Sequence, residues 1–77
     1  MAALVYFRKV SETEEVVEYE FGDDPDAFGR RLVVDKASGT PAVRDGRVDH
    51  AFLLASRKLG VLYAERGVWP ERGMGAT

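Results

Sequence analysis

The sequence contains no cysteine and a single histidine, His50. Without cysteine the chain forms no disulfide bond and lacks the thiolates on which most structural zinc sites depend. The sequence therefore predicts neither a bound metal nor a cofactor. A chain of 77 residues also has a small core, so we expect it to gain stability by associating with a partner chain.

Long apolar runs are also missing. The first apolar run, residues 2–7, is shorter than the apolar region of a secretory signal peptide, and no stretch reaches the roughly 20 residues of a membrane span. The sequence thus predicts a cytoplasmic protein with no membrane contact. Asparagine, glutamine and isoleucine are absent and arginines outnumber lysines, a composition typical of a GC-rich bacterial genome.

Acidic residues are concentrated in one segment. Residues 11–26 contain eight of the thirteen acids and no base, so the net charge of -2 conceals a strong separation of charge along the chain. We expect two of these acids, Glu18 and Glu20, to pair with bases on neighbouring strands rather than with a second copy of the chain. The bases concerned are Arg8, Lys9, Arg31 and Lys36.

Four segments have the pattern of β-strands and are separated by turn-forming residues. They are residues 2–10, 16–21, 31–36 and 42–44. The second is the clearest, because Val17, Tyr19 and Phe21 alternate with glutamates, which is typical of a strand with one buried face. The first and third carry apolar residues on both faces.

From residue 47 to residue 66 the apolar period changes from two to 3.6, and Gly67 follows at the position of a C-cap glycine. This pattern predicts one long helix. Its expected core-facing residues are Val48, Ala51, Phe52, Ala55, Leu59, Leu62 and Tyr63. We expect residues 68–77 to form a tail that is ordered around Trp69 and frays elsewhere.

These elements predict an α+β fold, in which a small antiparallel sheet of three or four strands packs against one long C-terminal helix. Residues 1–67 are expected to form a single domain, followed by the tail 68–77, because the sequence contains no repeat and no linker.

Two features of this fold predict a homodimer. One helix covers only one face of a sheet, so the second apolar face needs a cover. The helix also carries apolar and small residues outside its core stripe. The predicted interface residues are Leu53, Leu54, Ser56, Gly60, Val61 and Ala64. An alternative for Gly60 is that the helix tolerates it or breaks there.

No group of residues resembles a catalytic site. His50 would need an orienting carboxylate and a nucleophile, but Asp49 projects about 100° away on the helix and Ser56 lies more than a turn along it. The acids of residues 23–26 fit turn formation better than a calcium loop. We therefore predict a non-enzymatic, homodimeric binding or accessory protein whose partner is another protein or a small ligand at the dimer seam.

Two alternatives remain open. One is a nucleic-acid-binding module, although a pI of about 5.3 and the absence of asparagine and glutamine count against it. Its basic face would consist of Arg30, Arg31, Arg44 and Arg57. The other is a small enzyme whose site is completed across the dimer by His50, Tyr63 or the glutamates of the second strand.

Overall fold

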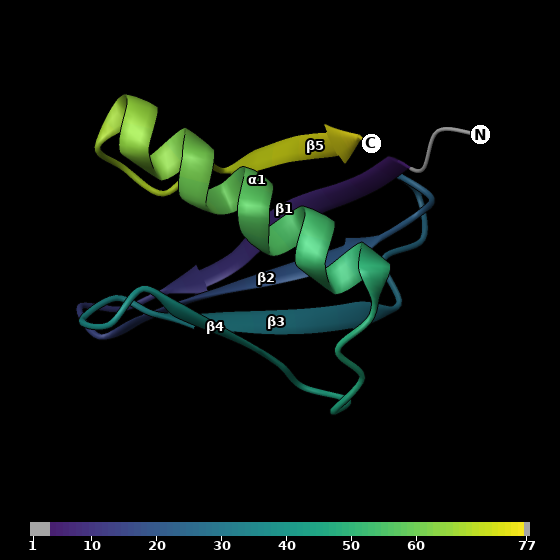
Figure 1. Ribbon diagram of the computed structural model, residues 1–77, viewed down its shortest axis with the longest axis horizontal. Helices are drawn as coiled ribbons and strands as arrows, with labels where there is room; N and C mark the ends of the chain where they lie inside the picture. Colours follow the sequence, from purple (N-terminus) through teal and green to yellow (C-terminus); the bar gives the residue numbers. More distant parts are fainter. Residues whose placement is uncertain (1–3, 77) are drawn as a thin grey trace.

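The computed structural model describes residues 4–76. Residues 1–3 and 77, which the predictions for the first strand and the tail include, lie outside the described residues. The described part of the chain forms five strands and one helix (Figure 1). Their bounds are β1 (Leu4–Glu12), β2 (Val16–Gly22), β3 (Arg30–Asp35), β4 (Thr40–Val43), α1 (His50–Arg66) and β5 (Arg72–Ala76).

All five strands belong to one antiparallel sheet with the order β4-β3-β2-β1-β5. The first four follow one another as hairpins. The helix then crosses one face of the sheet, and the chain returns to add β5 beside β1 (Figure 1). The predicted α+β class, a small antiparallel sheet with one long helix, is confirmed.

The sheet has five strands instead of three or four, because part of the predicted tail is a strand. Residues 72–76 form β5, where the sequence predicts fraying beyond Trp69. Two glycines make this possible, since Gly73 pairs with Phe7 and Gly75 pairs with Val5 on β1. A Cβ atom at position 73 would lie 2.6 Å from Phe7 Cζ, so only glycine lets the strand approach the core this closely.

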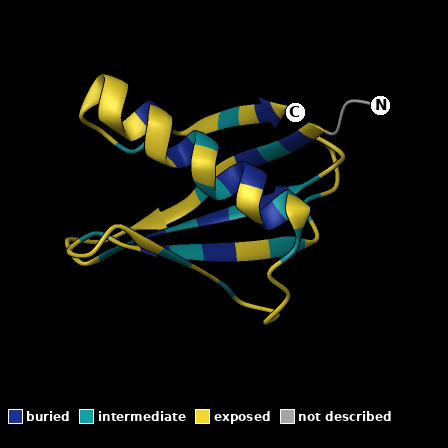
Figure 2. Cartoon of the chain, viewed as in Figure 1, coloured by how far each residue is buried: buried dark blue, intermediate teal, exposed yellow. Residues whose placement is uncertain are grey.

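The core lies between α1 and the sheet face that α1 covers (Figure 2). Its buried residues are Val5, Phe7, Val17, Tyr19, Phe21, Leu32, Val34, Phe52, Leu54, Ala55, Leu59 and Leu62. Tyr19 satisfies its hydroxyl by donating to the Pro70 carbonyl oxygen at 2.5 Å, and burial raises the pKa of that hydroxyl. This bond joins the sheet to the connection between α1 and β5.

The helix has the predicted C-terminus but begins three residues later than predicted. Asp49 is the N-cap, accepting a hydrogen bond from the Phe52 amide at 3.1 Å, and Gly67 closes α1 with a φ of +74°. Val48 therefore lies before the helix and is 68% exposed. Among residues 4–76, no helix combines the length and apolar character needed to cross a membrane.

Two residues of α1 differ from the predicted burial. Tyr63, expected in the core, is 42% exposed, whereas Leu54, expected at a dimer interface, is buried at 7%. The reason is β5, which extends the sheet beyond β1 and covers the flank of α1 that carries Leu54: a Cβ at Gly75 would lie 3.3 Å from the Leu54 carbonyl oxygen.

The sheet face away from α1 carries ion pairs, so it is not the continuous apolar surface that the strand pattern predicts. Glu20 pairs with Arg8, and Glu18 lies 3.1 Å from Arg44 and 3.9 Å from Arg31. The predicted pairs Glu20–Arg8 and Glu18–Arg31 are therefore confirmed, whereas Arg44, the closer partner of Glu18, was not predicted, and Lys36 pairs with Glu12 instead. These contacts lie at the surface, where each adds little stability.

Lys9 takes no part in those pairs because alternation along β1 places it on the same side of the sheet as the buried Val5 and Phe7. Lys9 lies opposite the buried Tyr19, on the helix-covered side of the sheet. There it contacts Glu12, which also holds Lys36. The register shift between Lys9 and Ser11 places Glu12 opposite the buried Val17, so this β-bulge brings Glu12 to the same side of the sheet as Lys9.

Candidate functional site

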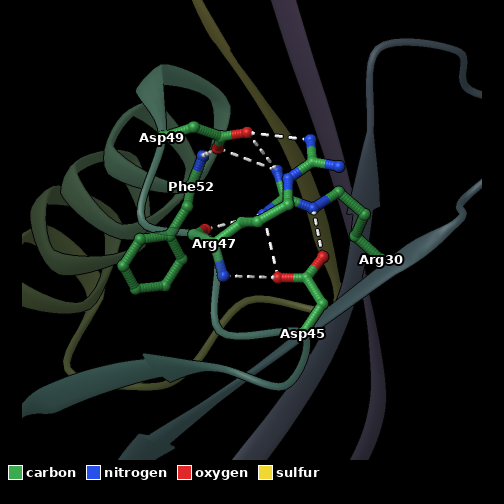
Figure 3. Close-up of polar contacts among 5 residues, drawn as sticks. All are labelled: Arg30, Asp45, Arg47, Asp49 and Phe52. Atoms are coloured by element: carbon green, nitrogen blue, oxygen red, sulfur yellow. Dashed lines mark hydrogen bonds and ion pairs between the residues drawn. The ribbon is translucent and has the colours of Figure 1, made fainter.

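Arg30, at the start of β3, holds the best-connected polar cluster of the described residues (Figure 3). Its Nε donates to Asp45 at 2.8 Å, its Nη1 donates to Asp49 at 2.8 Å, and its Nη2 donates to the Arg47 carbonyl oxygen at 2.8 Å. The guanidinium also lies 4.8 Å from the centre of the Phe21 ring. This cluster fastens the residues before α1 to the sheet, so Arg30 has a structural role.

The cluster predicts that the protein loses stability in acid. Hydrogen bonding to Arg30 lowers the pKa of Asp45 to about 2 and holds the pKa of Asp49 well below its usual range. In the unfolded chain both carboxyls titrate near pH ~4. The stabilisation is therefore complete above that pH and is lost as the pH falls to about 2.

Urea unfolding at a series of pH values measures this loss. Arg30→Gln is expected to be less stable at neutral pH and to lose less stability in acid than the unmodified protein, because the largest cause of both lowered pKa values is then removed. If Arg30→Gln lost as much stability in acid as the unmodified protein, carboxylates other than Asp45 and Asp49 would cause the loss.

The four arginines of the nucleic-acid alternative do not meet on one face. Arg30 lies in the cluster beside the helix N-terminus, whereas Arg31 and Arg44 contact Glu18 on the uncovered sheet face. Arg57 lies on α1, which packs on the opposite side of the sheet. Three of the four are paired with carboxylates, so these residues form no shared basic surface.

The residues of the enzyme alternative are also separated within one chain. His50 is the exposed first residue of α1, and Tyr63, near the other end, is stacked on Trp69 with ring centres 4.3 Å apart. Glu18 and Glu20 lie on the uncovered sheet face in ion pairs. No acid, base and nucleophile come together among these residues.

The predicted interface residues of α1 lie on two different sides of the helix. Leu54 and the 43% exposed Val61 border β5. At 100° per residue, the other four project about 100° away from them. They are Leu53, Ser56, Gly60 and Ala64. Leu53 is 53% exposed, and a Cβ atom at Gly60 would meet nothing within 4 Å, so this side of α1 is open in the single chain.

The structure also reveals a feature that the sequence analysis missed: the free edge of β5. The Lys9 amide donates to the Glu71 carbonyl oxygen at 2.7 Å, which fixes which residues face β1. Because backbone groups alternate in an antiparallel pair, Arg72, Met74 and Ala76 direct their N–H and C=O groups away from β1. No other described strand lies on that side.

The opposite edge of the sheet is blocked. The Arg44 amide donates to the Arg31 carbonyl oxygen, so by the same alternation position 41 of β4 faces outward. Pro41 occupies this position and has no N–H to offer. Proline is a common means of protecting a sheet edge, and β5 contains none.

A groove of about 580 Å³ runs along β5 beside α1. Leu54 and Val61 of α1 supply its apolar wall, and β5 borders the groove at Met74, Gly75 and Ala76. Arg57 and Lys58 also line it, and neither has a carboxylate within ion-pair distance among residues 4–76. The groove therefore combines an unpaired backbone edge, apolar side chains and uncompensated positive charge.

No protein-family model, curated protein or solved structure matches this chain. The function therefore has to be inferred from the geometry of the chain itself, and the free edge of β5 with its groove is the candidate functional site.

Proposed function

We propose that this chain is a non-enzymatic binding protein that works as a homodimer, in which the β5 strands of two copies pair along their free edges. The unprotected edge of β5 carries this proposal. An unpaired edge is a template for another strand, and proteins usually block or cover edges that are not used. Pro41 blocks β4, whereas β5 has no such block.

Self-pairing of β5 is compatible with two-fold symmetry, because a strand paired antiparallel with its own copy presents the same surface twice. With Met74 at the axis, Arg72 of each copy lies opposite Ala76 of the other, which keeps the two guanidinium groups apart. Leu4 and Met74 are 44% and 46% exposed. Pairing brings the two copies of this apolar surface together and removes part of it from water.

Charge supports the same arrangement. Val61 lines the groove together with Met74, so an axis near Met74 makes the two copies of α1 run past each other in opposite directions. Arg57 and Lys58, which precede Val61, then face the exposed Glu65 of the other copy. The uncompensated cations of each groove thus meet an acid on the second copy.

The pairing state of the polar side chains supports a binding role over an enzymatic one. Arg30 is fully engaged with two aspartates and a carbonyl oxygen, and Glu18 and Glu20 are held by arginines. Groups held in this way stabilise the fold and are not free to transfer protons or attack a substrate.

Light scattering tests the proposal directly. A species of twice the 8.5 kDa chain mass is expected at micromolar concentration and also at high salt, because backbone hydrogen bonds and apolar burial carry the contact. A monomer at every concentration would contradict the homodimer. Salt-sensitive retention on an immobilised oligonucleotide would favour the nucleic-acid alternative instead.

A further inference from the structure

A cavity of about 730 Å³ lies at the C-terminal end of α1, and among the residues that line it only Arg72 also belongs to β5, the strand of the proposed dimer contact. Strand ends and the connection from α1 to β5 surround it. Its chemistry comes from two groups of side chains, an ammonium pair on one side and an aromatic pair on the other. The residues concerned are Lys9, Glu12, Lys36, Tyr63, Arg66 and Trp69.

Two lysines share one carboxylate in this cavity. Lys9 Nζ lies 2.5 Å from one oxygen of Glu12, and Lys36 Nζ lies 2.6 Å from the other. Their side chains are only 12% and 22% exposed, so both ammonium groups are partly withdrawn from water. Burial disfavours the charge of Lys9, but the hydrogen bonds and negative charges of Glu12 and Glu71 together outweigh it, and the pKa of Lys9 is raised. Lys9 is therefore charged.

Positive charge is in excess around this carboxylate. Glu71 approaches Lys9 at 3.4 Å but is 82% exposed, so it compensates the lysine weakly. Arg66 also lines the cavity and has no carboxylate within ion-pair distance among the described residues. Two lysines arranged around a carboxylate with a spare cation nearby form a receptor for an anionic group.

The aromatic side of the cavity is a stacked pair. Tyr63 and Trp69 have ring centres 4.3 Å apart and an angle of 19° between their planes. Trp69 is half-buried against the core, which holds it in place, while Tyr63 is 42% exposed. A rigid aromatic wall beside cations suits a planar ring that carries a negative group.

We propose that this cavity binds a small aromatic anion, a planar ring joined to a carboxylate or phosphate. The anionic group lies between Lys9 and Lys36 in place of Glu12, and the ring lies against the Tyr63–Trp69 pair. Glu12 is thus an internal competitor that occupies the anion position when no ligand is bound.

Trp69 is the only tryptophan of the chain, so its fluorescence reports directly on the cavity. The probes are phenyl phosphate and benzoate, with inorganic phosphate and phenol as controls that lack the ring or the charge. Saturable changes are expected with both aromatic anions, at dissociation constants about tenfold or more below those of the controls. The ratio between the two aromatic anions identifies the preferred anionic group.

Two substitutions test the assignment in opposite directions. Lys36→Met is expected to weaken binding of the better probe about tenfold or more, and Glu12→Gln to strengthen it severalfold, because the competing charge is removed. Thermal unfolding of each variant checks that the fold is intact. Linear quenching equal to that of a free tryptophan amide, or affinities unchanged in both variants, would overturn the proposal.

Binding is also measured on Met74→Pro, a variant that disrupts the free edge of β5. The cavity is formed within one chain, so its affinity for the better probe is expected to be the same in monomer and dimer. If the unmodified protein is a monomer that binds the probe, only the β5 contact is refuted, and if it is a dimer that does not bind the probe, only the cavity is refuted.

Discussion

Met74→Pro is expected to convert the homodimer into a monomer. The N–H of Met74 points to the free edge of β5 and takes no part in pairing with β1, so proline removes only the group offered to the second copy. Two-fold symmetry removes two such donors per dimer. At about 1–3 kcal/mol for each carbonyl left without its partner, the dissociation constant should rise roughly 30-fold or more. Sedimentation or light scattering across a concentration series measures this change.

Met74→Ala is the matched control for this experiment. It keeps the backbone N–H and removes only apolar contact, so the dimer should persist with a smaller loss of affinity. Circular dichroism should be the same for both variants. A proline variant that remains fully dimeric would exclude β5 as the contact. If Gly60→Ala were the variant that dissociated instead, the interface would lie on the side of α1 that carries Gly60 and Ala64.

Gly73→Ala is expected to destabilise the fold, although alanine costs less conformational entropy on folding than glycine does. The added Cβ would lie 2.6 Å from Phe7 Cζ. The Phe7 ring has little room to withdraw, because it is 1% exposed and packs edge-on against Tyr19 with ring centres 5.8 Å apart. Overpacking of this kind costs about 1–3 kcal/mol, which lowers the melting temperature of a small domain by several degrees.

Gly60→Ala is expected to have the opposite effect on stability from Gly73→Ala. Gly60 lies inside α1, and its Cβ would meet nothing within 4 Å. Alanine should therefore raise the free energy of unfolding by about 0.5–1 kcal/mol through helix propensity alone. Urea unfolding of both variants at one protein concentration measures the two opposite changes in the free energy of unfolding. Stabilisation by Gly73→Ala would mean that β5 does not pack against Phe7 as described.

Much of the fold could be predicted because it depends on local patterns. The helix has a 3.6-residue apolar period and ends at Gly67, and β2 alternates apolar and acidic residues. Pairing of Glu20 with Arg8 and of Glu18 with Arg31 was also predictable, because hairpins bring consecutive strands together. In each case the signal lies within a few residues of the structure it predicts.

The candidate site depends on contacts that no local pattern encodes. Residues 72–76 contain two glycines and have little strand propensity, yet they form β5 because β1 offers an edge and the ring of Phe7 leaves room only for glycine. A bulge beyond Lys9 brings Glu12 to the cavity side of the sheet, whereas strict alternation would place it on the uncovered face. The sequence by itself determined the α+β class, the helix and its end, and the charge pairing between neighbouring strands. Only the tertiary structure decided the fifth strand, the burial of Leu54 and the free edge, because these follow from pairing between segments more than sixty residues apart.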